Sequence, residues 1–361
     1  MLASILTPAR WPLVLAACAA LATAAAVAQA QPPGSQSSTP LPSQSAPTPG
    51  SSSGWLTLMG QASRHTSYDG VVMIASSGRT STVQVSHRRE GDQETDAMES
   101  LDGPVQQVYR RNGEVRVLWP DSKTGLLRRH DDALGFPMQW SQADERILDV
   151  YEVVVLGRQR WAGQRAVVLQ FKPRDAFRYG QRVWAEEKGG LVLRAETLAP
   201  KGQVLEWAAF TQVTLSPSGR PLAAPDPGAL SGWRWLRSEV LSTSLEQEGW
   251  RVASLPPGFR LLGCVRRSGF PRETPSASGA SAGKPSRLAH QGMIQAVFSD
   301  GVSQVSVFIE PFDARRHQRE LLLLRGATQT LQRKQGAWWL TVVGDVPAPA
   351  VQRFSAAFER L

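Results

Sequence analysis

The chain has 361 residues and carries 40 Lys and Arg against 31 Asp and Glu, a net charge of +9. In the cytosol this balance would suit a nucleic-acid partner. The first thirty residues predict export, which excludes nucleic acid and leaves acidic proteins and anionic lipid headgroups as partners. A chain of this length can bury a sufficient core without disulfide bonds.

Residues 1–30 have the pattern of a signal peptide. Arg10 precedes an apolar run from Trp11 to Val27, and Ala28-Gln29-Ala30 matches the small-x-small site that a signal peptidase cleaves. The run is short for a spanning helix, which needs about 20 apolar residues. We therefore expect cleavage after Ala30. Leu15-Ala16-Ala17-Cys18 resembles a lipoprotein signal, so acylation of Cys18 stays open as the alternative.

A disordered tether and a short helix are expected next. Residues 31–53 are rich in Pro, Ser and Gly and have almost nothing to bury, which is typical of a disordered linker. An apolar stripe from Trp55 to Ala62 then repeats at i, i+3, i+4 and i+7. This spacing predicts an amphipathic helix with Ser53 as its N-cap.

From Asp69 to Leu215 the pattern changes to the alternation typical of half-buried strands. Asn112-Gly113 between two such runs predicts a tight hairpin. A second helix is expected within Met138–Asp149. About ten short strands joined by tight turns, with two helices, predict a large antiparallel sheet curled into an unclosed β-barrel, with the helices across its concave face. We assign this unit to residues 54–215.

A smaller α+β domain is expected at residues 233–361, after a Pro- and Gly-rich linker at 216–232. A Ser-, Gly- and Pro-rich stretch at 268–288 predicts a mobile insertion. The strands and the final helix expected in this domain are Phe259–Val265, Met293–Phe298, Val302–Ile309, Ala337–Val343 and, for the helix, Val351 to Leu361. Cys264 lies in the first of these strands and is interpreted as a buried apolar side chain.

The sequence contains no arrangement typical of catalysis. The five histidines are far apart without metal-ligand spacing. Gly279–Ser286 faintly resembles a phosphate loop, but Pro285 stands where a helix N-terminus must supply an N–H group. We therefore expect a binding protein without a cofactor, a metal site or catalytic residues.

Twelve tryptophans against four tyrosines suit core packing and equally the lining of a lipid cavity. A curled sheet with few helices leaves a gap that acyl chains can fill, and each buried methylene contributes about 0.8 kcal/mol. The hypothesis places acyl chains on alternating apolar residues and lipid phosphates on an arginine pair. The residues assigned are Val71, Met73, Val183, Leu191, Leu193, Arg88 and Arg89.

Several strings resemble the MucB/RseB family and run in order from about Trp55 to the C-terminus. They are Tyr68-Asp69-Gly70, His87-Arg88, Glu99-Ser100-Leu101-Asp102-Gly103-Pro104, Phe177-Arg178-Tyr179-Gly180-Gln181-Arg182-Val183-Trp184, the segments 190–198 and 203–211, Leu255-Pro256-Pro257-Gly258-Phe259, the segments 298–301 and 305–310, and Thr341-Val342-Val343-Gly344-Asp345-Val346-Pro347. The resemblance covers essentially the whole chain after the leader and tether. The chain departs from the family at 268–288 and at Gln181.

The resemblance implies a periplasmic negative regulator of the sigma-E envelope stress response. Such a protein binds the periplasmic part of a membrane-anchored anti-sigma factor, shields it from site-1 proteolysis, and is released by lipid or lipopolysaccharide. The family's large domain resembles the lipoprotein carriers LolA and LolB, so a carrier or receptor is the alternative function. The second domain after Ser216 counts against that alternative, because a simple carrier does not need it. Homo-oligomer formation stays open.

Overall fold

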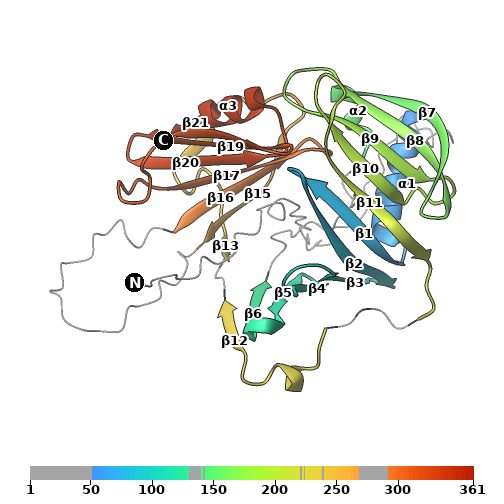
Figure 1. Ribbon diagram of the computed structural model, residues 1–361. Helices are drawn as coiled ribbons and strands as arrows, with labels where there is room; N and C mark the ends of the chain where they lie inside the picture. Colours follow the sequence, from blue (N-terminus) through green and yellow to red (C-terminus); the bar gives the residue numbers. More distant parts are fainter. Residues whose placement is uncertain are drawn as a thin grey trace, which may run out of the picture.

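The computed structural model describes residues 51–129, 140, 143–219, 222, 224–237, 240–267 and 292–361. The expected signal peptide, nearly all of the expected tether and the expected insertion at 268–288 lie outside the described residues. Within these ranges, no helix combines the length and the apolar character that crossing a membrane requires. The described chain forms one large and one smaller sheet, each with helices on it (Figure 1).

The large sheet has twelve strands in the order β12-β6-β5-β4-β3-β2-β1-β11-β10-β9-β8-β7. β1 to β11 are antiparallel to their neighbours, whereas β12 is parallel to β6. Its edges, β7 and β12, do not pair with each other, so the barrel is unclosed as expected. The strands are β1 Tyr68–Ser76, β2 Arg79–Glu90, β3 Gln93–Ser100, β4 Gln107–Arg111, β5 Glu114–Trp119, β6 Thr124–Arg129, β7 Tyr151–Trp161, β8 Gln164–Pro173, β9 Gly180–Glu186, β10 Val192–Leu198, β11 Val204–Leu215 and β12 Arg234–Arg237.

Tight turns explain why consecutive strands pair. Asn112 and Gly113, with φ of 49° and 76°, join β4 to β5 as the Asn-Gly signal predicts. Ala162 and Gly163, with φ of 44° and 80°, join β7 to β8 in the same way. Two left-handed residues match the right-handed twist of the strands they connect, so each hairpin continues the curl of the sheet.

The helix α1, Ser52–His65, packs against the inner face of the large sheet (Figure 1). Its N-cap is Ser51, whose side chain accepts a hydrogen bond from Gly54 N at 3.0 Å, so the expected cap at Ser53 is two residues too late. Leu56 and Met59 are fully buried on this face. The second expected helix is the single turn α2, Ile147–Val150.

The strand β12 lies after the expected linker but belongs to the large sheet. Trp235 of β12 covers Gly125 on β6. Any side chain at position 125 would clash with the indole ring, because its Cβ atom would lie 2.6 Å from it. The chain therefore returns to the first unit before it enters the second one. The boundaries assigned from sequence at 215 and 233 stay predictions.

The smaller sheet has seven strands in the order β13-β15-β16-β17-β20-β19-β18, and α3, Ala348–Ala357, packs on β17, β19 and β20. The final helix is shorter than expected, because Phe358 begins the strand β21, which pairs with β14. A further hairpin, β18–β19, was not predicted. The seven strands are β13 Val240–Ser242, β15 Arg260–Arg267, β16 Met293–Ser299, β17 Gln304–Pro311, β18 Leu321–Arg325, β19 Thr328–Gln335 and β20 Trp338–Gly344. The separate two-stranded sheet consists of β14 Trp250–Val252 and β21 Phe358–Arg360.

Candidate functional site

The five residues expected to hold acyl chains lie in different surroundings. Val183 is fully buried in the cluster that contains α1, whereas Leu191 and Leu193 are buried in the cluster that contains Trp184. Val71 and Met73 on β1 are half-buried. The structure thus places three of these side chains inside packed cores, and a lipid that contacts them has to displace protein side chains. Their role in lipid binding stays a prediction.

The two arginines expected to bind lipid phosphates make contacts within the protein. Arg88 is buried and donates to both carboxylate oxygens of Asp69, at 2.6 and 2.8 Å, and to Tyr68 O at 3.0 Å. Burial raises the pKa of Asp69, but the Arg88 hydrogen bonds outweigh it and leave that pKa lowered. Arg89 donates to Gly91 O at 2.7 Å. Of the two guanidinium groups, the half-buried Arg89 is the more accessible.

Beside Arg88, the strands β2, β3 and β4 bring together a buried polar cluster. His87 Nδ1 lies 2.7 Å from Asp96 Oδ1, and both side chains are fully buried. The ligand atoms of His87, Glu94 and Asp96 lie within 4.8 Å of one another, which is metal-like spacing. Arg110, however, contacts Glu94 at 2.6 Å and Asp96 at 2.5 Å. Its guanidinium already supplies the positive charge that these carboxylates need.

Arg178 forms a contact between the two units. It lies between β8 and β9, is fully buried, and contacts Asp300 of the smaller unit at 2.6 Å. It also contacts Asp175 at 3.0 Å and donates to Pro257 O at 2.5 Å. Asp300 accepts hydrogen bonds from the N–H groups of two residues in its own turn, Val302 and Ser303. These bonds orient Asp300 toward Arg178, so both members of the ion pair are held in place by neighbouring groups.

A second contact between the units holds two half-buried acids. Glu206 on β11 accepts a hydrogen bond from Ser76 at 3.1 Å and lies 3.4 Å from Ala327 N, at the tip of the β18–β19 hairpin. Burial and the nearby Asp345 raise the pKa of Glu206 to about 7. Burial also raises the pKa of Asp345, which accepts from Thr328 at 2.6 Å. Two carboxyl groups with raised pKa values therefore lie close together where the hairpin meets β11.

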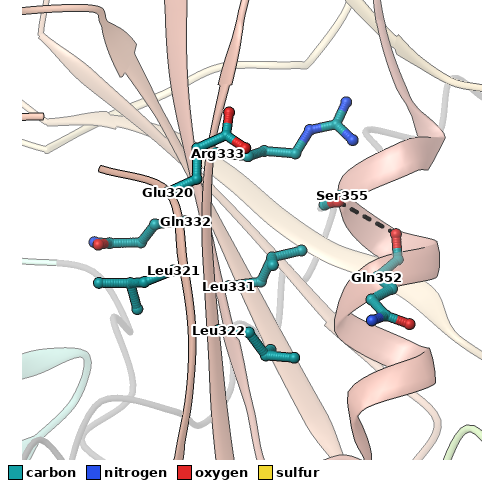
Figure 2. Close-up of a pocket in the computed structure, with 8 residues that line it drawn as sticks. All are labelled: Glu320, Leu321, Leu322, Leu331, Gln332, Arg333, Gln352 and Ser355. Carbon is teal, nitrogen blue, oxygen red and sulfur yellow. Dashed lines mark hydrogen bonds between the residues drawn. The ribbon is translucent and has the colours of Figure 1, made fainter. Parts of the chain in front are cut away.

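The two described cavities both lie in the smaller unit. One, of about 420 Å³, lies between β18, β19 and α3 (Figure 2). The other, of about 290 Å³, is lined by Glu248, Arg266, Trp338 and Arg360, among others. Cys264, as expected, is a buried side chain, and burial raises the pKa of its thiol to about 12.

Sequence reasoning did not assign roles to Arg178, Asp300, Glu206 or Asp345. All four stand within strings that carried the family resemblance, and Asp300 stands in a Ser-Asp-Gly turn. A charged residue in a turn is most often solvated, so nothing in the local pattern distinguishes these from surface groups. Four consecutive leucines, Leu321–Leu324, are visible in the sequence and form most of β18, a strand that was not predicted.

Comparisons with known proteins agree with this architecture. The sequence profile of the MucB/RseB N-terminal domain matches residues 51–229, and that of the MucB/RseB C-terminal domain matches residues 244–359. The chain belongs to the MucB/RseB family. The resemblance read from the sequence is thereby confirmed, and so is the fold of an unclosed sheet with a smaller C-terminal sheet domain.

Individual members of the MucB/RseB family match along most of their length. The sigma factor AlgU regulatory protein MucB of Pseudomonas aeruginosa is 29% identical over 83% of this chain and 88% of that protein. The sigma-E factor regulatory protein RseB of Escherichia coli K12 is 23% identical over 83% of this chain and 88% of that protein. A MucA/MucB complex structure from Pseudomonas aeruginosa has a TM-score of 0.60, with 26% identity over 85% of this chain and 98% of the matched chain.

Proposed function

We propose that this protein is a periplasmic regulator that binds the periplasmic region of a transmembrane anti-sigma factor. The observation that carries the proposal is the similarity, along both units, to MucB chains whose structures contain MucA. Similarity across both units matters, because whichever unit contacts MucA in those complexes then has a counterpart in this chain. The buried Arg178–Asp300 contact supports a fixed placement here.

The proposed activity is binding without bond-making. The relatives are named as regulatory proteins, and their chains match this one nearly from end to end. Among the described residues, several buried charged groups are engaged in internal ion pairs, such as Arg88 with Asp69 and Arg110 with Asp96. Such groups stabilise a scaffold, and they offer no pair of an exposed nucleophile and a base.

Protection from regulated proteolysis is the proposed consequence of binding. A bound anti-sigma segment is cleaved slowly when its cleavage site is covered or held in a conformation that the protease cannot accept. The test incubates the anti-sigma periplasmic fragment with the site-1 protease, with and without this protein. We expect cleavage to slow in proportion to the fraction of fragment bound. Unchanged cleavage at saturating protein would refute the protective role.

Lipid or lipopolysaccharide is the proposed releasing signal. A lipid that binds the free protein more tightly than the complex must weaken partner binding by the same coupling free energy, commonly about 1–3 kcal/mol. Because Leu191, Leu193 and Val183 are buried in packed clusters, acyl chains reach them only if the core opens. The proposed lipid route therefore requires α1, which packs in the same cluster as Val183, to move away from the sheet. Titrating lipopolysaccharide into the preformed complex tests this, and a complex that persists at saturation contradicts it.

A further inference from the structure

The edge strand β18 is unusually apolar and open. Its sequence from Leu321 is four leucines followed by Arg325, and Leu322, Leu323 and Leu324 are 46%, 55% and 57% exposed. Soluble proteins usually protect an edge strand with central charges, proline or a bulge, since its free backbone groups pair readily with another chain. β18 carries charge at its end and none in its centre.

The backbone of β18 is ready to pair. β18 and β19 are in register from Leu321–Gln332 to Arg325–Thr328 without a bulge. In an antiparallel pair, every second residue points its N–H and C=O away from the partner strand. Within the described part of the chain, β18 is the last strand of its sheet on this side, so those groups point outward. An added strand can satisfy them in the manner of β-augmentation.

A cavity beside this edge can take a side chain. Leu322 and Leu331 are cross-strand partners, and Figure 2 shows both on the side of the hairpin that faces α3. With Gln352 and Ser355 of α3, they line the cavity of about 420 Å³. That volume lies within the range of small ligand pockets, about 300–1,000 Å³. The cavity is largely open to solvent, so an apolar side chain of an added strand can enter it from the edge.

The surroundings of β18 are basic. Arg319, Arg325 and Lys334 are exposed, and the acid at this edge, Glu320, accepts a hydrogen bond from Lys334 N at 2.8 Å. Arg333 lines the cavity, and its Nε has no hydrogen-bond partner among the described residues. A buried donor without a partner is costly, and a carboxylate is its strongest acceptor. The charge and the free donor both favour an acidic occupant.

We propose that β18 receives an extended acidic segment of a partner protein as an added strand, with one apolar side chain in the cavity against α3. The inference rests on the proposed function, since it takes that segment to be part of the anti-sigma periplasmic region. It adds the surface and the mode of recognition. Main-chain pairing supplies the affinity, and the cavity and Arg333 select the sequence.

The test compares two variants at exposed leucines on edge strands. Leu322→Glu places a carboxylate at the cavity mouth, where it repels an acidic segment, while Leu156→Glu alters a 50% exposed leucine on the edge strand β7. We expect Leu322→Glu to weaken binding of the anti-sigma periplasmic fragment at least about tenfold and Leu156→Glu to leave it unchanged. Hydrogen exchange on the wild-type complex is the variant-free measurement, with protection expected at alternate β18 amides.

Each outcome decides the matter. Equal affinity of Leu322→Glu and wild type, equal weakening by both variants, or unprotected β18 amides overturn the inference while the proposed function stands. Leu322→Glu could instead change the molecular mass measured without the fragment while leaving the affinity for the fragment unaltered. That result would assign β18 to contacts between copies of this chain and would also overturn the inference. If wild type fails to bind the fragment, the proposed function falls and this inference with it.

Discussion

Arg178→Ala is expected to destabilise the protein more than any surface charge removal. The substitution leaves Asp300 fully buried and without its cation, which was 2.6 Å away. Breaking a buried ion pair from one side costs about 3–5 kcal/mol. Arg178 also lies over the rings of Tyr151 and Phe259, at 5.6 and 5.2 Å, and losing these contacts adds to the cost. We expect a loss of about 4 kcal/mol.

The loss should depend on pH in a defined direction. Burial raises the pKa of Asp300, and Arg178 opposes that rise. Without Arg178 the pKa rises further, so the folded variant takes up a proton at a pH where the unfolded chain is still ionised. The destabilisation is therefore greatest at neutral pH and shrinks as the pH falls toward the ordinary aspartate value of 3.8. Urea unfolding followed by tryptophan fluorescence at about pH 7 and about pH 5 measures it.

Arg158→Ala is the matched control. Arg158 contacts Glu187 at 2.6 Å, the same distance as the buried pair, but its side chain is 71% exposed. Exposed pairs contribute about 0–1 kcal/mol. If Arg178→Ala costs no more than Arg158→Ala, or if Asp300→Asn in the Arg178→Ala background restores nothing, burial of this pair does not stabilise the contact between the units.

Four further substitutions test other parts of the structure. The pKa of Glu206 is about 7 in the folded protein and 4.5 in the unfolded chain, so the stability of the protein falls as the pH rises between these values. Glu206→Gln should flatten this dependence in thermal melts between about pH 5 and pH 8. A variant whose melting temperature changes with pH as steeply as that of wild type would refute the argument. Leu193→Ala should cost about 2–5 kcal/mol by cavity formation, and Met73→Ala, at a half-buried site, clearly less; equal losses in urea unfolding would contradict the packing. Gly190→Ala should cost about 1–3 kcal/mol, because φ is +79° and the new Cβ would lie 2.6 Å from Leu58; an unchanged denaturation midpoint would count against this geometry.

Local patterns in the sequence predicted most of the large sheet. Asn112-Gly113 requires two left-handed residues, and the alternation of apolar residues defines each strand's faces, so hairpin and register follow from short-range chemistry. The helix α1 was found from its apolar stripe, while its cap was misplaced because Ser51 and Ser53 are chemically equivalent as caps. The strand β12 could not be found, since its four residues pair with a strand about a hundred positions earlier.

The contacts between the units could not be predicted in this way. Arg178 and Asp300 are 122 positions apart, and each stands in a turn where charged residues are normally exposed. Their burial arises only when the two units meet. The lipid hypothesis treated Leu191 and Leu193 as cavity lining from alternation alone, which distinguishes an inward face from an outward one but not a filled interior from a hollow one. The β18 edge was overlooked because four consecutive leucines fit neither a helical nor an alternating period.

The central claim is that this chain acts by holding an anti-sigma factor. Its most direct test is a calorimetric titration of the chain from residue 31 onward with the periplasmic fragment of the anti-sigma factor from the same organism. We predict saturable binding with a dissociation constant below about 1 μM, weakened by salt because the protein is basic. Two folded proteins that show no heat and no complex at concentrations of about 100 μM would contradict the claim.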